Sequence, residues 1–299
     1  MFNTPILFDI FNRPGATQKV FDAIRQQKPK YLYVHADGPR KHKPQESEIC
    51  QQVRDIIKVD WDCELKTLFQ NENLGCKIAE STAITWFFEN VEQGIILSDD
   101  CLPHPSFFPY CEELLEKYKD DTRIGHISGD NFLHTGIIEP EFSYDFCFAT
   151  HIWGWATWRR VWKNYDVNFP FWSEQKGKRS FLFYNKWDEI YHSTFISDVL
   201  NNRNGINTWD EQYVLTLRLQ NQLSIYPAVN LVTNIGLGDP NAVHTAKKNN
   251  KLSIPVSELS FPLKHPQYVL RNKNLDNMTS RKLFFSWKRL IKYFFNAIS

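Results

Sequence analysis

Two adjacent carboxylates, Asp99 and Asp100, follow an apolar run in the segment GIILSDDCLPHP. Pro103 and Pro105 prevent regular structure from resuming directly after them, so we expect the pair at the rim of a sheet. Proteins hold Mg²⁺ and Mn²⁺ through one or two carboxylates, while diphosphate oxygens complete the coordination shell. The pair therefore predicts a metal-diphosphate site at a strand end. A helix N-cap followed by a solvated acidic turn also explains the dipeptide.

The elements that must position this pair alternate between strands and helices. From residue 5 to about residue 130, β-rich runs such as KYLYVHAD alternate with stretches of helical period such as KIAESTAITWFFENV. This pattern predicts an α/β fold, with a mostly parallel sheet, helices on both faces, and a ligand at the carboxyl ends of the strands. No dinucleotide-binding or P-loop glycine motif is present. Polar groups follow four strands: Asn12 and Arg13, Asp37 and Gly38, Asn73 and Gly75, and Asp99 and Asp100.

Beyond residue 140 the alternation stops and tryptophans become frequent. Most of the ten must fill the core, and Trp158 and Trp162 are spaced as on one face of a helix. Trp155, next to Gly154, is a candidate for a ligand contact, because indole rings pack on the C–H faces of sugars and Gly154 leaves room for a ring. We expect a catalytic domain over residues 1–260, with a nucleotide-binding half (1–130) and an acceptor half (131–260), and a basic extension over residues 261–299.

Composition narrows the class of protein further. The chain has 299 residues and 42% hydrophobic content, enough for a full core. Its six cysteines form no CxxC pair, which favours free thiols in a reducing compartment. No apolar stretch is long enough to span a bilayer, and the first residues lack a basic leader, so we expect a soluble or peripheral cytoplasmic protein. Nothing in the sequence calls for a nucleic acid partner.

The tail of the chain is basic. Residues 240–299 contain eleven Lys and Arg against two acids, a net charge of +9, which leaves −8 for residues 1–239 because the total is +1. Residues 279–299 combine five bases with apolar residues at helical spacing and contain no acid. This composition predicts an amphipathic helix that lies on the inner membrane surface. Docking of the helix onto its own domain is the competing explanation.

Several segments together carry a family resemblance: PILFDIFNRPG, YLYVHADGPR, NLGCKIAES, IILSDDCLPHP and WGWATWRRVWKNYD. From about residue 4 to residue 250, the chain resembles bacterial nucleotide-diphospho-sugar transferases of the GT-A fold, and is similar to family 2 glycosyltransferases. Asp99 and Asp100 are similar to the DxD-type motif of that superfamily. This chain has Ser98 where relatives commonly have a further acid.

The resemblance implies roles for individual residues. Phe11, Asn12 and Arg13 would receive the nucleotide base together with Asp37 and Gly38, while Asn73 and Gly75 would lie close to the nucleoside. Taken alone, the segments around Asp37 and Asn73 are also ordinary turns and loops. Asp99 and Asp100 would hold Mn²⁺ or Mg²⁺, with His244 of the loop NIGLGDPNAVHT as a further metal or diphosphate contact. A lone loop histidine is otherwise a surface residue.

The same resemblance places the catalytic base in the segment INTWDEQY. A carboxylate there would take the proton of the acceptor hydroxyl as its oxygen attacks the anomeric carbon. Asp210 is the preferred base and Glu211 the neighbouring candidate. Alternatively, Asp210 caps a helix DEQYVLTLRL and Glu211 lies in its first turn, and both roles are compatible.

We therefore expect a metal-dependent, inverting glycosyltransferase. It would move a sugar from a nucleoside-diphosphate sugar to a glycan or lipid-linked acceptor during the synthesis of a surface polysaccharide. A sugar nucleotidyltransferase is the first alternative, although the loop FNRPGATQK supplies only part of the Gly-rich, basic loop that such an enzyme needs. A non-catalytic glycan-binding protein is the second, and the tryptophan content favours it.

Overall fold

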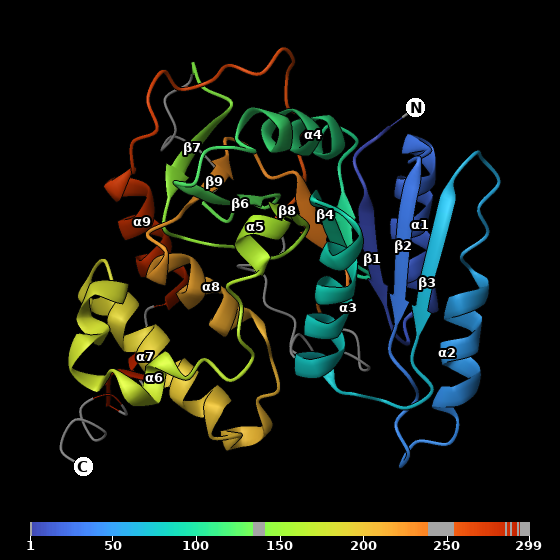
Figure 1. Cartoon of the computed structure of the whole chain (residues 1–299), viewed down its shortest axis with the longest axis horizontal. Helices are drawn as coiled ribbons and strands as arrows, with labels where there is room; N and C mark the ends of the chain where they lie inside the picture. The colour runs from blue at the N-terminus through green and yellow to red at the C-terminus, as the bar shows by residue number, and fades with distance from the viewer. Residues whose placement is uncertain are drawn as a thin grey trace.

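The central element of the computed structural model is an eight-stranded sheet with the strand order β3-β2-β1-β4-β8-β6-β9-β7 (Figure 1). The structure describes residues 2–133, 141–238 and 254–284, together with residues 286, 287, 289–291 and 293. The strands of this sheet are β1 (Ile6–Ile10), β2 (Tyr31–Ala36), β3 (Glu64–Phe69), β4 (Gln93–Ser98), β6 (Ile124–Ser128), β7 (Tyr144–Cys147), β8 (Trp155–Trp158) and β9 (Leu223–Pro227). A separate ribbon pairs β5 (Cys101–Pro103) with β10 (Val232–Asn234).

Most strands of the large sheet run in the same direction. β1 pairs in parallel with β2 and β4, β2 pairs in parallel with β3, and β6 pairs in parallel with β9. β8 is antiparallel to both β4 and β6, and β7 is antiparallel to β9. The carboxyl ends of β1, β2, β3, β4 and β6 therefore meet at one edge, which is where ligands bind in sheets of this kind.

Helices cover both faces of the sheet. Trp155 and Trp158 of β8 point to opposite faces: the ring of Trp155 contacts Tyr213 of α8, whereas Trp158 donates a hydrogen bond to the carbonyl of Leu115 in α4. The helices α3 and α8 are joined by a hydrogen bond from Trp209 to Glu80. The helices are α1 (Pro14–Gln27), α2 (Glu46–Asp55), α3 (Cys76–Asn90), α4 (Phe107–Lys117), α5 (Arg159–Trp162), α6 (Phe171–Glu174), α7 (Lys186–Leu200), α8 (Asp210–Leu219) and α9 (Lys273–Thr279). The 3-10 helices Lys176–Leu182 and Arg203–Gly205 and the π-helix Ser280–Phe284 complete them.

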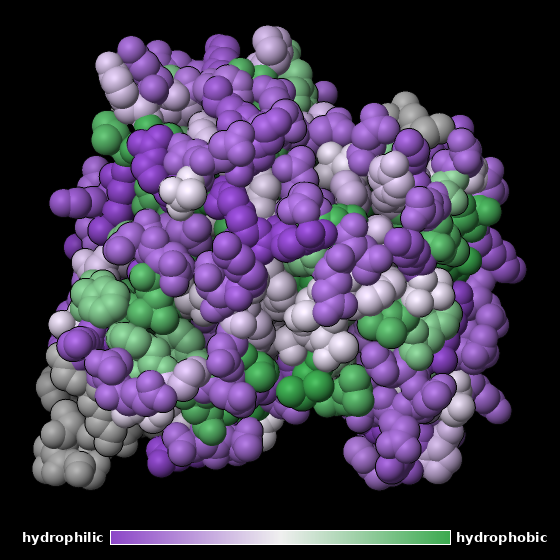
Figure 2. Space-filling view, viewed as in Figure 1, coloured by the Kyte–Doolittle hydropathy of each residue, from purple (hydrophilic) through white to green (hydrophobic). Residues whose placement is uncertain are grey.

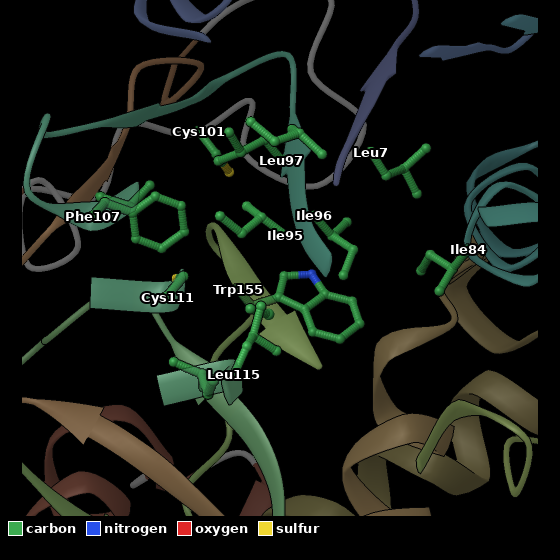
Figure 3. Close-up of a cluster of buried hydrophobic side chains, with 14 of the residues drawn as sticks. Leu7, Ile84, Ile95, Ile96, Leu97, Cys101, Phe107, Cys111, Leu115 and Trp155 are labelled. Carbon is green, nitrogen blue, oxygen red and sulfur yellow. The ribbon is translucent and has the colours of Figure 1, made fainter. Parts of the chain in front are cut away.

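The main core lies between the sheet and these helices. Figure 3 shows Ile96 of β4 next to the indole of Trp155, and Leu97 and Leu7 from the central strands belong to the same buried cluster. The outer surface is mostly hydrophilic, and hydrophobic residues appear on the face in Figure 2 as small separate groups. Among the described residues, no helix has both the length and the apolar character that crossing a bilayer requires.

The predicted α/β class, with its mostly parallel sheet and its helices on both faces, is confirmed. All six cysteines are free, as expected. The aromatic half differs from the prediction, because it contributes the strands β7 and β8 to the same sheet. Trp158 is buried as expected, but it lies in β8, and the short helix α5 begins only at Arg159.

The C-terminal extension packs on the domain. α9 follows an isolated bridge between Phe146 and Arg271, and Asp276 in α9 accepts hydrogen bonds from the backbone of Phe148 and Ala149. Further along the chain, the ring of Phe284 stacks on Tyr191 of α7 at 4.3 Å. The C-terminal extension therefore packs against the segment after β7 and against α7.

Candidate active site

The acid pair surrounds one cationic group. Arg13, directly after β1, donates to Asp100 Oδ2 at 2.6 Å through one terminal nitrogen and to Asp99 Oδ1 through the other. The Asp99 and Asp100 side chains are 3% and 9% exposed and that of Arg13 is 17% exposed, so this ion pair is largely desolvated. The carboxylates converge on a position that already holds positive charge.

Burial and charge act in opposite directions on this group. Burial raises the pKa of Asp99 to about 7, although the Arg13 guanidinium lowers it in part. Burial also lowers the pKa of Arg13, but Asp99 and Asp100 raise it by more, so the guanidinium stays charged. The geometry suits a cation between two acids, and a divalent ion would need Arg13 to give up its place there.

The donor set fits Mn²⁺ or Mg²⁺. Two adjacent carboxylates supply oxygen ligands, and such ions take their remaining ligands from substrate phosphates and water. Within the described residues, no group of three or more His, Cys, Asp or Glu side chains is arranged to hold a metal. His244, predicted as a further ligand, lies outside the described residues.

The loops after β1 and β2 are tied together next to this group. The Asn12 side chain donates to Glu46 at 2.8 Å, and Glu46 also pairs with Arg40. The Arg40 guanidinium lies over the ring of Phe11, 5.4 Å from its centroid. Phe11 also donates its backbone N–H to Asp99 at 3.3 Å. Phe11, Asn12 and Arg13 therefore lie beside the acid pair together with Glu46 and Arg40, and their contact with a nucleotide base stays a prediction.

Asp37 acts as a clamp between the loops after β2 and β3. Its carboxylate accepts hydrogen bonds from the backbone of Gly38 and Leu74, from Gly75 and from the Asn73 side chain, at 2.7–3.3 Å. Gly38 is needed because a Cβ there would lie 2.4 Å from the backbone of Glu72. Three of these bonds come from the loop after β3, so Asp37 holds the two loops together. Its contact with a nucleotide base stays a prediction.

Asp210 and Glu211 both lie in the first turn of α8 but in different surroundings. Asp210 is partly exposed and accepts a hydrogen bond from the Thr208 hydroxyl. Glu211 is only 3% exposed and accepts from His192 Nδ1 at 2.8 Å, within a network that includes Asp188. The N-cap residue of α8 is Trp209, so Asp210 is not the cap. Of the two, Asp210 is the more exposed, and Glu211 is buried within the network.

Glu80 of α3 is an acid near Asp210 whose contacts the sequence did not predict. Its carboxylate accepts a hydrogen bond from the indole of Trp209 at 2.6 Å and another from the Cys76 thiol at 3.0 Å. Burial first, then the charges of Asp9 and Asp210, raise its pKa to about 8. Asp9 also raises the pKa of Asp99, so Asp9 lies within electrostatic reach of both groups. The helix α3 contains other polar residues, so the sequence offers no clear signal for Glu80.

This pKa predicts how stability changes with pH. In the unfolded chain Glu80 ionises near pH 4.5, as an ordinary glutamate does, whereas in the folded chain it keeps its proton to about pH 8. The folded state therefore binds more protons between these values, and the free energy of unfolding falls as pH rises through this window. In Glu80→Gln we expect a smaller fall in melting temperature from pH 5 to pH 8 than in the wild-type chain. Glu89→Gln, an exposed acid of the same helix, is the control. An equal fall in melting temperature from pH 5 to pH 8 in Glu80→Gln and the wild-type chain would contradict the raised pKa of Glu80.

A second buried pair follows β6 at the same edge. His151 Nδ1 lies 2.9 Å from Asp130 Oδ1, and the two residues are 7% and 1% exposed. The rings of Phe132 and Tyr226 pack against His151. The other polar atoms, Asp130 Oδ2 and His151 Nε2, are buried and have no hydrogen-bond partner among the residues that the structure describes. Neither residue was predicted, because they are separated by 21 positions and meet only through the fold.

The structure places Trp155 differently from the prediction. Its ring is only 2% exposed and stacks between His126 and Trp209, at centroid distances of 5.2 Å and 5.7 Å. β8 directs this side chain into the space between the sheet and α8, away from the strand-end edge. Trp155 is therefore a core residue and does not line the site.

The comparisons with known proteins give only remote similarity. The sequence matches no protein-family model and no curated protein. A solved structure of the mannosyltransferase PcManGT from Pyrobaculum calidifontis, in complex with GDP-Man and Mn²⁺, is similar over 56% of this chain and 49% of that chain, with 15% identity and a TM-score of 0.38. This chain thus spans about half the length of that enzyme. HddC from Yersinia pseudotuberculosis is similar over 58% of this chain and 86% of that chain, with 11% identity and a TM-score of 0.34. These values are too low to assign the chain to a family.

Proposed function

We propose that this protein is a metal-dependent glycosyltransferase that uses a nucleoside-diphosphate sugar as donor. The observation that carries the proposal is the convergence of Asp99 and Asp100 on one cation, at the edge where the loops after β1, β2 and β3 meet. This edge combines a place for a divalent ion and diphosphate with aromatic and amide groups for a nucleoside. The sequence resemblance to GT-A transferases agrees with that arrangement.

The chain's own residues would share the work as follows. Phe11 offers its ring to the base, and Asn12 and Asn73 offer amides to the nucleoside. Asp99 and Asp100 would hold Mn²⁺ or Mg²⁺, which neutralises the charge of the departing diphosphate. Asp210 takes the proton of the acceptor hydroxyl as that oxygen attacks the anomeric carbon. Because this mechanism assigns one base and uses no enzyme nucleophile, the transfer would invert the configuration at the anomeric carbon.

Two features separate this proposal from its alternatives. A sugar nucleotidyltransferase needs a Gly-rich, basic loop after the first strand to stabilise a triphosphate, and the segment FNRPGATQK supplies only part of such a loop. A non-catalytic glycan-binding protein would display its tryptophans. In this structure five tryptophans of the aromatic half are no more than 7% exposed: Trp155, Trp158, Trp162, Trp172 and Trp209. The tryptophan content thus no longer favours glycan binding.

A thermal-shift screen tests the proposal. Uridine, guanosine and thymidine diphosphate sugars are added to the full chain with and without Mn²⁺, and one class is expected to raise the melting temperature only when Mn²⁺ is present. A donor at about one hundred times its Kd should stabilise the fold by about 2.7 kcal/mol. Absence of a shift with every donor would count against the proposal. Release of pyrophosphate from a nucleoside triphosphate and a sugar phosphate would favour the nucleotidyltransferase.

The acceptor is proposed to be a glycan or lipid-linked sugar at the inner membrane surface, in surface polysaccharide synthesis. The contacts and exposure of the C-terminal tail bear on the proposed location at the membrane surface. Arg289 packs over Tyr191 and Tyr293 donates to Glu189, so one side of the tail docks on α7, which was the competing explanation. Trp287 and Ile291, four residues apart, remain 67% and 57% exposed. We propose that these two side chains insert between lipid headgroups while the bases attract an anionic leaflet.

The double variant Trp287→Ser/Ile291→Ser tests this role of the tail. It should lose co-sedimentation with anionic vesicles and remain folded, with a melting temperature above that of Phe284→Ala, because both side chains are mostly exposed. Phe284→Ala is the matched control, since it removes the stacking on Tyr191 and should lower the melting temperature. Equal sedimentation of the double variant and the wild-type chain across a salt series would leave the tail with a purely structural role.

A further inference from the structure

The position between Asp99 and Asp100 is held by a side chain of the protein itself. Arg13 makes a two-point contact in which each terminal nitrogen serves a different carboxylate. Without a cation there, two neighbouring carboxylates that are nearly excluded from water would repel each other. Arg13 therefore supplies the counter-charge that lets the acid pair stay buried in the fold.

The backbone of Arg13 is fixed while its side chain can move. The Arg13 carbonyl accepts hydrogen bonds from both the backbone N–H and the hydroxyl of Thr17, at 2.9 Å and 2.8 Å, in the first turn of α1. The guanidinium lies at the end of a long flexible chain and keeps 17% exposure. A change of rotamer therefore removes the guanidinium from the acids without moving β1 or α1.

Space at the acid pair admits only one cationic group at a time. A Cβ at Gly236 would lie 2.6 Å from Asp100 Oδ2 and 2.7 Å from an Arg13 terminal nitrogen, so the chain after β10 passes directly over the ion pair. That segment is tied to the acids through the bond from Ile235 N–H to the Asp100 carbonyl. A divalent ion bound by both carboxylates would meet Arg13 at contact distance, and two positive charges so close repel strongly.

We propose that Arg13 is an internal cation that the metal displaces, and that the released guanidinium then binds the donor diphosphate. Only the binding of Arg13 to the donor diphosphate rests on the proposed function; the displacement of Arg13 by the metal does not. A guanidinium offers paired N–H donors that match phosphate oxygens, and Arg13 already stands next to the position that a metal-bound diphosphate would take. Metal binding alone must break the ion pair, whereas metal and diphosphate together give Arg13 a new partner. Metal and nucleotide should therefore strengthen each other's binding.

Mn²⁺ binding to the full chain, followed by the electron paramagnetic resonance signal of free Mn²⁺, tests the displacement without turnover. Arg13→Gln should bind Mn²⁺ alone about tenfold more tightly than the wild-type chain, which is a typical size for a coupling between sites. Arg13→Lys, which keeps the charge but loses the two-point contact, should fall between them. Arg40→Gln removes a positive charge from the same edge without touching the acid pair, and should change Mn²⁺ affinity less than twofold.

Two results would overturn the proposal. Equal Mn²⁺ affinity in Arg13→Gln and wild type would show that Arg13 does not compete with the metal. An equal rise in Mn²⁺ affinity in Arg13→Gln and Arg40→Gln would show that the effect comes only from the loss of a positive charge near the site. Melting curves of each variant establish that it is folded.

A second titration separates this proposal from the proposed function. UDP and GDP are each added, and the better ligand should tighten Mn²⁺ binding in the wild-type chain by about tenfold but have a much smaller effect in Arg13→Gln. Nucleotide coupling that is equal in both chains would contradict the transfer of Arg13 to the diphosphate. If neither nucleotide binds to any variant, the proposed function fails, and the comparison with Mn²⁺ alone still decides the displacement.

Discussion

The Asp210→Asn variant is expected to bind the nucleoside-diphosphate sugar as tightly as the wild-type chain and to lose about 10²- to 10⁴-fold in turnover, the usual contribution of a positioned general base. The amide keeps the shape of the side chain and can still accept from the Thr208 hydroxyl, so α8 should begin at the same residue. Donor affinity by calorimetry and turnover by release of nucleoside diphosphate, measured on the same preparation, check both halves of this expectation.

Glu211→Gln is the matched control, because the two acids are adjacent in one helix. Glu211 is buried against His192, and its substitution disturbs a network that also contains Asp188 and Arg218. Its main effect should therefore be a lower melting temperature, with turnover per folded molecule retained. Near-normal turnover in Asp210→Asn, together with an inactive but folded Glu211→Gln, would move the base one residue along the chain.

The Asp100→Asn variant should lose Mn²⁺-dependent binding of nucleoside diphosphate altogether. It removes one of the two charges that would hold the metal and leaves an amide, which is a weaker ligand for a hard cation. The fold should persist, since the side chain lies at the strand-end edge and Arg13 retains its bond to Asp99. Calorimetry of UDP and GDP with and without Mn²⁺ measures the loss.

Asp121→Asn provides a control for the change of charge, because Asp121 lies after α4 and pairs with Arg123 on the surface. It should bind nucleotide and Mn²⁺ as the wild-type chain does. Metal-dependent binding of equal strength in Asp100→Asn and wild type would remove Asp100 from the metal site and leave Asp99 as the candidate.

The parts of the site that follow strands could be predicted from the sequence. Parallel strands end at a common edge, so polar residues after β1, β2, β3 and β4 had to meet there, and Arg13, Asp37, Asn73 and Asp99 do so. Their partners were harder to predict. Nothing in the spacing of Arg13 and Asp99 indicates an ion pair, because these side chains come from loops separated by 86 positions.

In the aromatic half, residues 131–260, the local sequence pattern does not predict the secondary structure. β7 and β8 are only four residues long, and both are antiparallel to their neighbours: β8 lies between β4 and β6, and β7 is the edge strand beside β9. A run of four residues contains too little periodicity to separate strand from helix. Trp155 illustrates the result, since its role depends on the face of β8 to which it belongs. Asp130 and His151 were missed for the same reason, because their meeting depends on that topology.

The clamp at Asp37 has a further consequence for recognition. Three of its hydrogen bonds join the loop after β2 to the loop after β3, which ties the two segments together. The conformational entropy of ordering both loops is then lost when the chain folds, and a nucleoside that docks there does not lose it again. Two loops that are already held in one conformation favour a ligand that fits that conformation over ligands of other shapes. Selectivity for one base would thus originate in a carboxylate that the base need not touch.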